Sequence, residues 1–385
     1  MTREINSVRI APDSNTISQN LGLLADLAGT WRGHGFNLIA RPDFEGGTPL
    51  YLQLNQTDEM LTIDPIGAPV PDRGFGQDDI ELFGLTYLDQ ISDQFTGGAL
   101  HIEPGIWVTQ PATSYPPETP PAGGQIVFRL ATIPHGNAVL AQGAATPFTG
   151  PPTLDADGQE YAFSVFPSFN STPFPVTTPP TGFKINAAGS SEEKSAPPAA
   201  KGGFTEYNLA IPDSATNPRT PFDTSPPDPA LPVSIDGVAM QQVLEDPITL
   251  LQAAIQSQVA QGCTFEGVAL NIATQPSVTF LTEENNPGGP SEVVTVADGT
   301  GGIENTLFLE GSNQQGTVGS SGPNAFTSLV YATFWIEKVT APDRDPFMQL
   351  QYAQMTVLNF EILGVPNSLL GWPHVSVATL QKSFR

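Results

Sequence analysis

The segment that most constrains the fold of this chain is an alternating, β-branched stretch near the C-terminus, residues 372–382. It reads Trp-Pro-His-Val-Ser-Val-Ala-Thr-Leu-Gln-Lys. Such alternation of apolar and polar side chains is typical of a strand with two different faces. Its expected partner is residues 27–36, Leu-Ala-Gly-Thr-Trp-Arg-Gly-His-Gly-Phe. A closed antiparallel sheet would place these first and last strands side by side, because closure removes exposed sheet edges.

Short strand-like segments separated by turn residues fill most of the chain between these two stretches. Residues 50–55 and 59–63 are expected to form a hairpin, residues 99–108 a pair of strands, and residues 125–134 and 138–143 a second hairpin. The other expected strands are residues 29–39, 80–91, 265–272, 277–282, 293–296, 306–310, 331–339, 348–360 and 374–382. This pattern predicts an all-β protein, a barrel or a sandwich. We favour a large antiparallel barrel closed by its first and last strands.

Two helices are expected beside the strands. Residues 15–27 carry apolar side chains at roughly helical spacing, and Ser14 or Asn15 is available as the N-cap. Residues 248–261 give the clearer pattern, with Asp246 as the predicted N-cap and Pro247 at the first helical position.

Between about residues 146 and 232 the strand pattern gives way to a long proline-rich excursion, in which only residues 204–211 look strand-like. We expect residues 187–203 to be exposed and mobile, since their composition cannot bury enough apolar surface to offset the entropy of ordering. We predict a single domain over residues 1–385. The alternative is two β domains, residues 1–185 and 235–385.

Charge narrows the choice of partners. Lysine and arginine total 14 against 39 aspartate and glutamate residues, which gives a net charge of −25. This balance argues against nucleic acid and anionic membranes as partners, because both require clustered basic residues.

The chain has no apolar signal core at its start and no apolar run long enough to cross a bilayer, so we expect a cytoplasmic protein. The single cysteine, Cys263, excludes an internal disulfide.

The two ends of the chain resemble known barrels. Gly29-Thr30-Trp31 is similar to the Gly-X-Trp signature that opens lipocalin-like (calycin) barrels, and with Gly33 and Gly35 it looks closer to the nitrobindins, which are small haem-binding barrels. The closing strand of that family begins with a histidine that ligates haem iron, follows a strand bearing methionine or threonine, and ends in basic residues. Residues 350–357, which include Met355 and Thr356, and residues 374–385, which begin with His374, are similar to that arrangement.

The whole chain also resembles a group of long bacterial proteins that carry the name haem-binding protein. The segments similar to them are residues 100–105, 133–136 and 372–375. These resemblances imply a calycin-like barrel with haem as cofactor and His374 as the iron ligand. The resemblance also points to His34 and Trp31 as residues that contact the cofactor. Peroxidase-like or diatomic-gas chemistry would follow from a histidine-ligated iron, and whether the protein is an enzyme stays open.

The residues themselves leave a second function open. His101 and Glu103 share one face of a strand, so one could orient the other as a general acid–base pair. A haem-free barrel could bind a hydrophobic small molecule, either as a carrier or as a cyclase or isomerase. If His374 points inward, Val375 and Val377 point outward. These two valines then need cover, which the helix at residues 248–261 or the long excursion could supply.

Overall fold

The fold is described from a computed structural model. It describes residues 14–152, 154, 184–185, 191–192, 209–210, 231–274, 278–280, 292–294, 302–305, 326–361 and 369–383, apart from residues 75, 115, 116 and 134–136. The predicted strand at residues 306–310, residues 204–208, and residues 187–203 other than Ser191–Glu192 lie outside the described residues.

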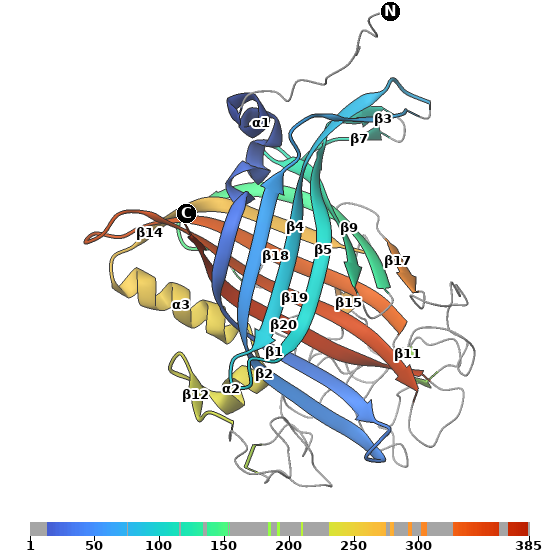
Figure 1. The fold of residues 1–385 in the computed structure, drawn as a ribbon, viewed down its shortest axis with the longest axis vertical. Helices are drawn as coiled ribbons and strands as arrows, with labels where there is room; N and C mark the ends of the chain where they lie inside the picture. The colour runs from blue at the N-terminus through green and yellow to red at the C-terminus, as the bar shows by residue number, and fades with distance from the viewer. Residues whose placement is uncertain are drawn as a thin grey trace, which may run out of the picture.

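Ten of the described strands form a closed antiparallel barrel, in agreement with the predicted fold class (Figure 1). Around the barrel they follow the order β14 (Thr264–Ala273), β18 (Phe326–Thr340), β19 (Phe347–Glu361), β20 (Leu369–Ser383), β1 (Gly29–Asp43), β2 (Thr48–Pro65), β4 (Ile80–Asp93), β5 (Ala99–Gln110), β8 (Gln125–Ile133) and β9 (Asn137–Thr149). Pairing of β9 with β14 closes the ring.

The predicted pairing of the first and last strands is confirmed. β1 and β20 run antiparallel, with Thr30 opposite Ser383 and Ile39 opposite His374. The register is continuous through Gly33 and Gly35, so these glycines mark no bulge. A Cβ at Gly33 would overlap the Thr379 carbonyl oxygen of β20. Glycine is therefore needed there because the two strands approach each other closely.

Two predicted turns proved to be parts of long strands. Residues 50–63 form no hairpin, because β2 is continuous from Thr48 to Pro65. The polar residues taken for a turn include Asn55 and Thr57, which are buried. Residues 99–108 are likewise part of one strand, β5. Pro104 is tolerated in it because the pairing of β5 with β8 begins only at Gly105.

The predicted hairpin of residues 125–143 is present as β8 and β9. However, β9 continues to Thr149, so the strand pattern ends later than the predicted start of the excursion at residue 146. The last residues of β9 pair with β14 and so help to close the barrel.

The remaining strands of the described residues are short. They are β3 (Val70–Asp72), β6 (Thr113–Ser114), β7 (Pro117–Glu118), β10 (Lys184–Ile185), β11 (Ser191–Glu192), β12 (Ser234–Ile235), β13 (Val238–Ala239), β15 (Val278–Phe280), β16 (Glu292–Val294) and β17 (Gly302–Asn305). Of these, β3 adds to β4 and β17 adds to β9.

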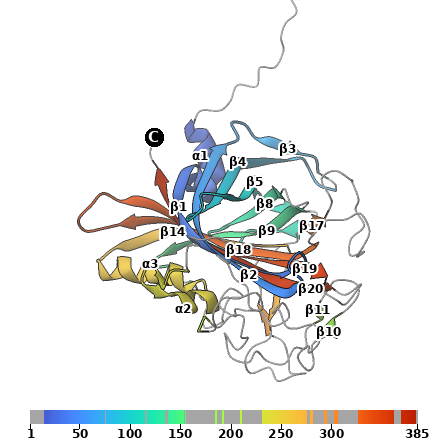
Figure 2. The ribbon, with the colours of Figure 1, turned by 60° about the horizontal axis from the view of Figure 1, so that its bottom comes forward.

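Helices close one end of the barrel and cover part of its wall. α1 (Ser14–Leu21) and the 3-10 helix η1 (Gly22–Leu27) lie at the top of Figure 1, and α2 (Met240–Glu245) and α3 (Thr249–Ala260) lie against the outside of the barrel (Figures 1 and 2). α3 matches the predicted helix, but the predicted N-cap is wrong. Asp246 ends α2, and its carbonyl oxygen accepts hydrogen bonds from Thr249 at the start of α3. Pro247 therefore precedes the helix.

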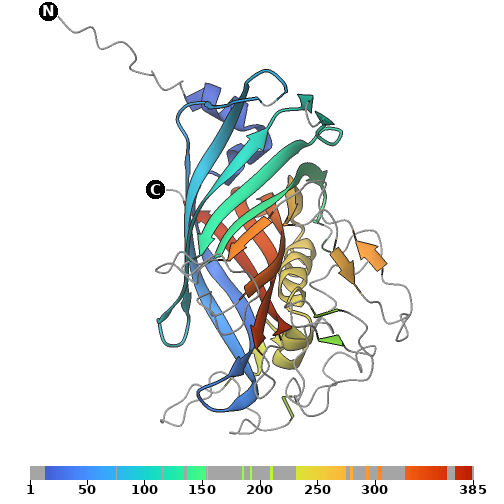
Figure 3. The same cartoon turned by 90° about the vertical axis from the view of Figure 1, so that its right-hand side faces the viewer.

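Two apolar cores result, one on each side of the barrel wall. The outer core contains Val375 and Val377 of β20 together with Leu251 and Ile255 of α3, which lies beside the orange and red strands in Figure 3. The predicted cover of these two valines by the helix is thus present. The inner core packs Leu24 and Leu27 with Trp31 and other inward residues of the barrel. None of the helices among the described residues is both long and apolar enough to span a membrane.

Candidate functional site

A cavity of about 550 Å³ lies inside the barrel. Its volume falls in the range typical of small-molecule sites. Apolar side chains form much of its wall, from Ile39, Leu61, Leu100, Trp107, Phe334, Leu358 and Phe360. The inner core around Trp31 and η1 closes the barrel at one end. The cavity therefore extends from this closed end toward the strand ends that carry Ile39 and His374.

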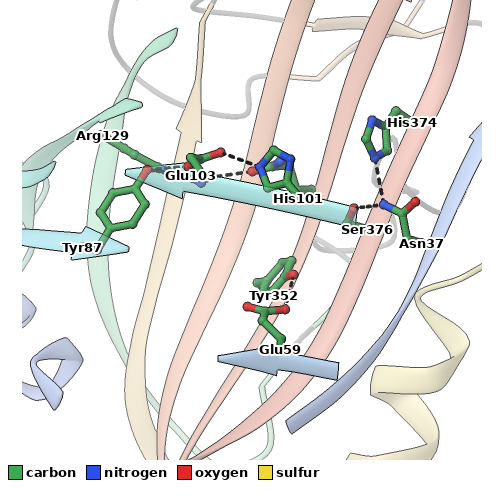
Figure 4. Close-up of polar contacts among 10 residues, drawn as sticks. Asn37, Glu59, Tyr87, His101, Glu103, Arg129, Tyr352, His374 and Ser376 are labelled. Carbon is green, nitrogen blue, oxygen red and sulfur yellow. Dashed lines mark hydrogen bonds and ion pairs between the residues drawn. The ribbon is translucent and has the colours of Figure 1, made fainter. Parts of the chain in front are cut away.

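A buried polar cluster lies near the closed end of the cavity. The Tyr87 hydroxyl donates to Glu103 Oε1 at 2.5 Å, and Arg129 Nε donates to the Tyr87 hydroxyl at 2.8 Å. Arg129 Nη2 also donates to Glu103 Oε1, and Nη1 donates to Gln354 at 2.7 Å. All three guanidinium nitrogens thus donate hydrogen bonds within the protein, and Figure 4 shows the contacts with Tyr87 and Glu103.

The Tyr87 ring reaches this cluster because the facing residue on β5 is a glycine. Gly105 lies directly opposite Tyr87 in the ladder. A Cβ at position 105 would overlap the end of the tyrosine ring. The glycine therefore gives the ring the space to lie across β5 and place its hydroxyl between Glu103 and Arg129.

Glu103 is held ionised by this arrangement. Burial alone would raise the pKa of its carboxyl, but the Arg129 charge and the hydrogen bonds from His101 and Tyr87 outweigh burial and lower the pKa to about 2. His101 Nε2 lies 3.4 Å from Glu103 Oε2, a long contact. The structure thus brings the two predicted acid–base residues together on the cavity wall. As a permanent carboxylate, Glu103 can orient His101 but cannot itself supply a proton near neutral pH.

Two further carboxyl groups line the cavity beside this cluster. Glu59 of β2 accepts a hydrogen bond from the Tyr352 hydroxyl at 2.6 Å, as Figure 4 shows. Burial raises the pKa of Glu59 to about 7. Asp89 of β4 lies directly opposite Glu103 in the ladder. Burial and then the neighbouring Glu59 and Glu103 charges raise the pKa of Asp89 well above its usual value.

His374 lines the other end of the cavity with Asn37 and Ser376. The Asn37 amide nitrogen lies 2.8 Å from His374 Nε2 and 2.6 Å from Ser376 Oγ (Figure 4). An amide nitrogen can only donate, so Nε2 of His374 accepts and carries no proton. The Asn37 contact thus selects a ring whose Nε2 lone pair is directed at the cavity wall.

The other residues predicted as cofactor contacts lie away from the cavity. Trp31 is fully buried in the inner core, and its indole nitrogen donates to the Leu27 carbonyl at 2.7 Å. It does not line the cavity. The His34 side chain is 66% exposed on the outer face of β1, where it donates to Asp58 at 2.6 Å. The fourth histidine, His135, lies outside the described residues.

Sequence reasoning missed Arg129, Tyr87, Glu59, Asp89 and Asn37. One signal was available for Arg129, which is a single charge within the apolar run Ile-Val-Phe-Arg-Leu of residues 126–130. A lone charge in such a strand must either reach solvent or meet a partner inside. Glu59 and Asp89 gave no comparable signal, because isolated acidic residues in alternating strands are usually solvated.

The fold and cavity together define a closed ten-strand antiparallel barrel with a small-molecule-sized interior. No family model matches the chain, and no curated protein matches it. It is similar to the crystal structure of Rv2717c from M. tuberculosis, with a TM-score of 0.31 and 11% identity, over 95% of this chain and 98% of that chain. Within the described residues, no group of three or more histidine, cysteine, aspartate or glutamate side chains could hold a metal ion.

Proposed function

We propose that this protein binds one amphipathic small molecule inside its barrel. The observation that carries the proposal is the cavity itself, about 550 Å³ with apolar walls and a buried polar end. Sites of this kind bury most of a ligand against apolar side chains and fix its orientation with a few polar groups. The ligand's apolar body would lie against Leu61, Trp107 and Phe334, and its polar end would face the carboxyl groups.

The same geometry accommodates either a carrier or an isomerase. His101 is the residue placed to accept or return a proton, since Glu103 beside it stays ionised. A carrier would need only the walls and the polar end of the cavity. An isomerase would also need His101, so replacement of His101 by glutamine would abolish turnover and leave binding intact.

The binding proposal is tested with a neutral dye whose fluorescence rises in apolar surroundings, such as Nile red. Ile39→Trp adds bulk to the cavity wall and is expected to reduce dye affinity at least tenfold. Leu88→Trp adds the same bulk at an exposed position of β4 and is expected to leave binding unchanged. Equal dye binding by both variants, or the absence of saturable binding by the wild type, would contradict the proposal.

Haem is the second candidate ligand, favoured by the position of His374 on the cavity wall. The ten-strand barrel is consistent with the calycin-like resemblance that suggested it. A neutral imidazole ligates iron through an unprotonated nitrogen, and the Asn37 contact selects a ring whose Nε2 carries no proton. Iron would take the place of the Asn37 amide at that nitrogen. When bound, haem would supply peroxidase-like or diatomic-gas chemistry. His374 would hold the iron, and Asn37 would set the orientation of the ring before binding.

A hemin titration followed at the Soret band separates the two candidates. If haem is the ligand, His374→Ala abolishes the band shift, because it removes the imidazole that would hold the iron. His34→Ala removes an imidazole from the outer surface and is expected to leave the titration unchanged. A wild-type protein that gives no Soret shift would remove haem as a ligand.

A further inference from the structure

Glu59 and Asp89 stand apart from the rest of the buried polar cluster, because each has an oxygen without a donor. Both line the cavity, and they are only 4% and 9% exposed. Glu59 Oε2 accepts from Tyr352, but no described residue donates to Glu59 Oε1 or to Asp89 Oδ1. Asp89 is opposite Leu61 on β2, two residues from Glu59, so the two side chains point into the barrel as diagonal neighbours.

From this geometry we infer that Glu59 and Asp89 bind the cationic amine end of an amphipathic ligand. The inference rests on the proposed function and names the chemistry of the ligand's polar end. A buried carboxylate is costly unless it is paired. An ammonium group carries three donors and one positive charge. It can therefore donate to both open oxygens, and its single charge balances one ionised carboxylate while the other carboxyl keeps its proton.

Among the charged groups of the cluster, Glu59 and Asp89 are the carboxyls whose negative charge no cation of the cluster balances. Facing it are Tyr87 of β4, His101 and Glu103 of β5, Arg129 of β8 and Tyr352 of β19. Arg129 and Glu103 neutralise each other through their ion pair. Without a ligand, Glu59 and Asp89 must therefore both keep their protons, in agreement with the direction in which burial raises the pKa of each group. An incoming ammonium group would take the place of one of these two protons.

The same contacts disfavour an anionic ligand at this end. The positive charge of Arg129 is already paired with Glu103, and three of its five N–H groups donate to Tyr87, Glu103 and Gln354, so this arginine gives a ligand carboxylate no unpaired positive charge. The other cavity-lining arginine, Arg41, lies on β1 eight residues from Gly33, which pairs with Glu59. That separation is about 26 Å along the strand. The net charge of −25 also favours the approach of a cation.

The test compares three twelve-carbon ligands that differ only in their head group: dodecylamine, dodecanol and dodecanoate. Each is used below its micellar concentration to displace Nile red from the full-length protein. We expect the amine to bind at least tenfold more tightly than the alcohol, and dodecanoate to bind most weakly. Amine affinity should rise between pH 6 and pH 8, because one carboxyl of the pair loses its proton while an alkylamine with a pKa near that of lysine stays charged. Calorimetry in two buffers of different ionisation enthalpy should show proton release on amine binding.

Glu59→Gln and Asp89→Asn are expected to remove the preference for the amine over the alcohol and also the proton release. Asp58→Asn, next to Glu59 but exposed on the outer face, should retain both. The inference is overturned if the alcohol binds as tightly as the amine while the dye still binds, or if either cavity variant keeps the amine preference. If a cavity variant fails to fold, the wild-type comparison of head groups and the proton count decide alone. Failure of the dye and all three ligands to bind would refute the proposed function as well.

Discussion

Glu337 offers the sharpest test of how this barrel tolerates buried carboxyl groups, because it lies outside the cavity. It is fully buried on β18, and its Oε2 accepts a hydrogen bond from Gln349 at 2.8 Å. Gln349 in turn exchanges hydrogen bonds with Gln258 of α3. No described residue donates to Glu337 Oε1. Burial raises the pKa of Glu337 from 4.5 to about 8.

The pKa shift sets the size of the expected effect. Between pH 4.5 and pH 8 the folded protein holds a proton on Glu337 that the unfolded chain has released, so the free energy of unfolding falls as pH rises. The slope is about 1.4 kcal/mol per pH unit for one proton. About 3 kcal/mol of stability is therefore lost between pH 4.5 and pH 7. Glu337→Gln removes the titration and keeps an acceptor for Gln349, so it should stabilise the protein by up to about 3 kcal/mol at pH 7.

Urea denaturation at pH 5 and at pH 7.5 measures this effect. The stability advantage of Glu337→Gln over the wild type should be much larger at pH 7.5 than at pH 5. Glu266→Gln provides the matched control, since Glu266 is exposed and pairs with Lys338 at the surface. That control should change stability by less than about 1 kcal/mol at either pH. A stability advantage of Glu337→Gln that is the same at both pH values would refute the reasoning.

Two further predictions concern the buried ion pair of the cavity. Arg129→Met should destabilise the protein by about 3–5 kcal/mol in urea denaturation, because it leaves the Glu103 carboxylate buried without its cation. Adding Glu103→Gln to that variant should restore part of the loss, and a purely additive double variant would contradict the pairing. Gly105→Ala should cost about 1–3 kcal/mol, because the new methyl group displaces the Tyr87 ring. Tyrosine fluorescence or the Tyr87 ring signals in an NMR spectrum unchanged from wild type would show that the ring has not moved.

The barrel was predictable from the sequence because its closure depends on local pattern. The alternation of residues 374–380 and the glycine-tryptophan opening at Gly29 were sufficient to predict the pairing of β1 with β20, which the register confirms. The turns were harder to predict. Asn55 and Thr57 resemble turn residues in sequence, yet they lie buried on the inner face of β2, where the Asn55 amide donates to Asp93. Polar residues on the inner face of a barrel strand are of the same types as the residues of a turn, so sequence alone does not distinguish the two.

The candidate site was less predictable, because a polar side chain inside a barrel gives the same alternation as one in water. Along β1, Phe36 and Leu38 belong to the outer core beneath α2 and α3, whereas Asn37 and Ile39 line the cavity. The apolar face of this strand therefore points away from the barrel axis, the reverse of a barrel with a wet outer surface. Only the cover that α2 and α3 give the outer face frees the inner face to carry Asn37 and His374. The apolar stripe of residues 248–261 could therefore be predicted to cover outward valines such as Val375 and Val377, but it does not show which polar side chains lie on the inner face.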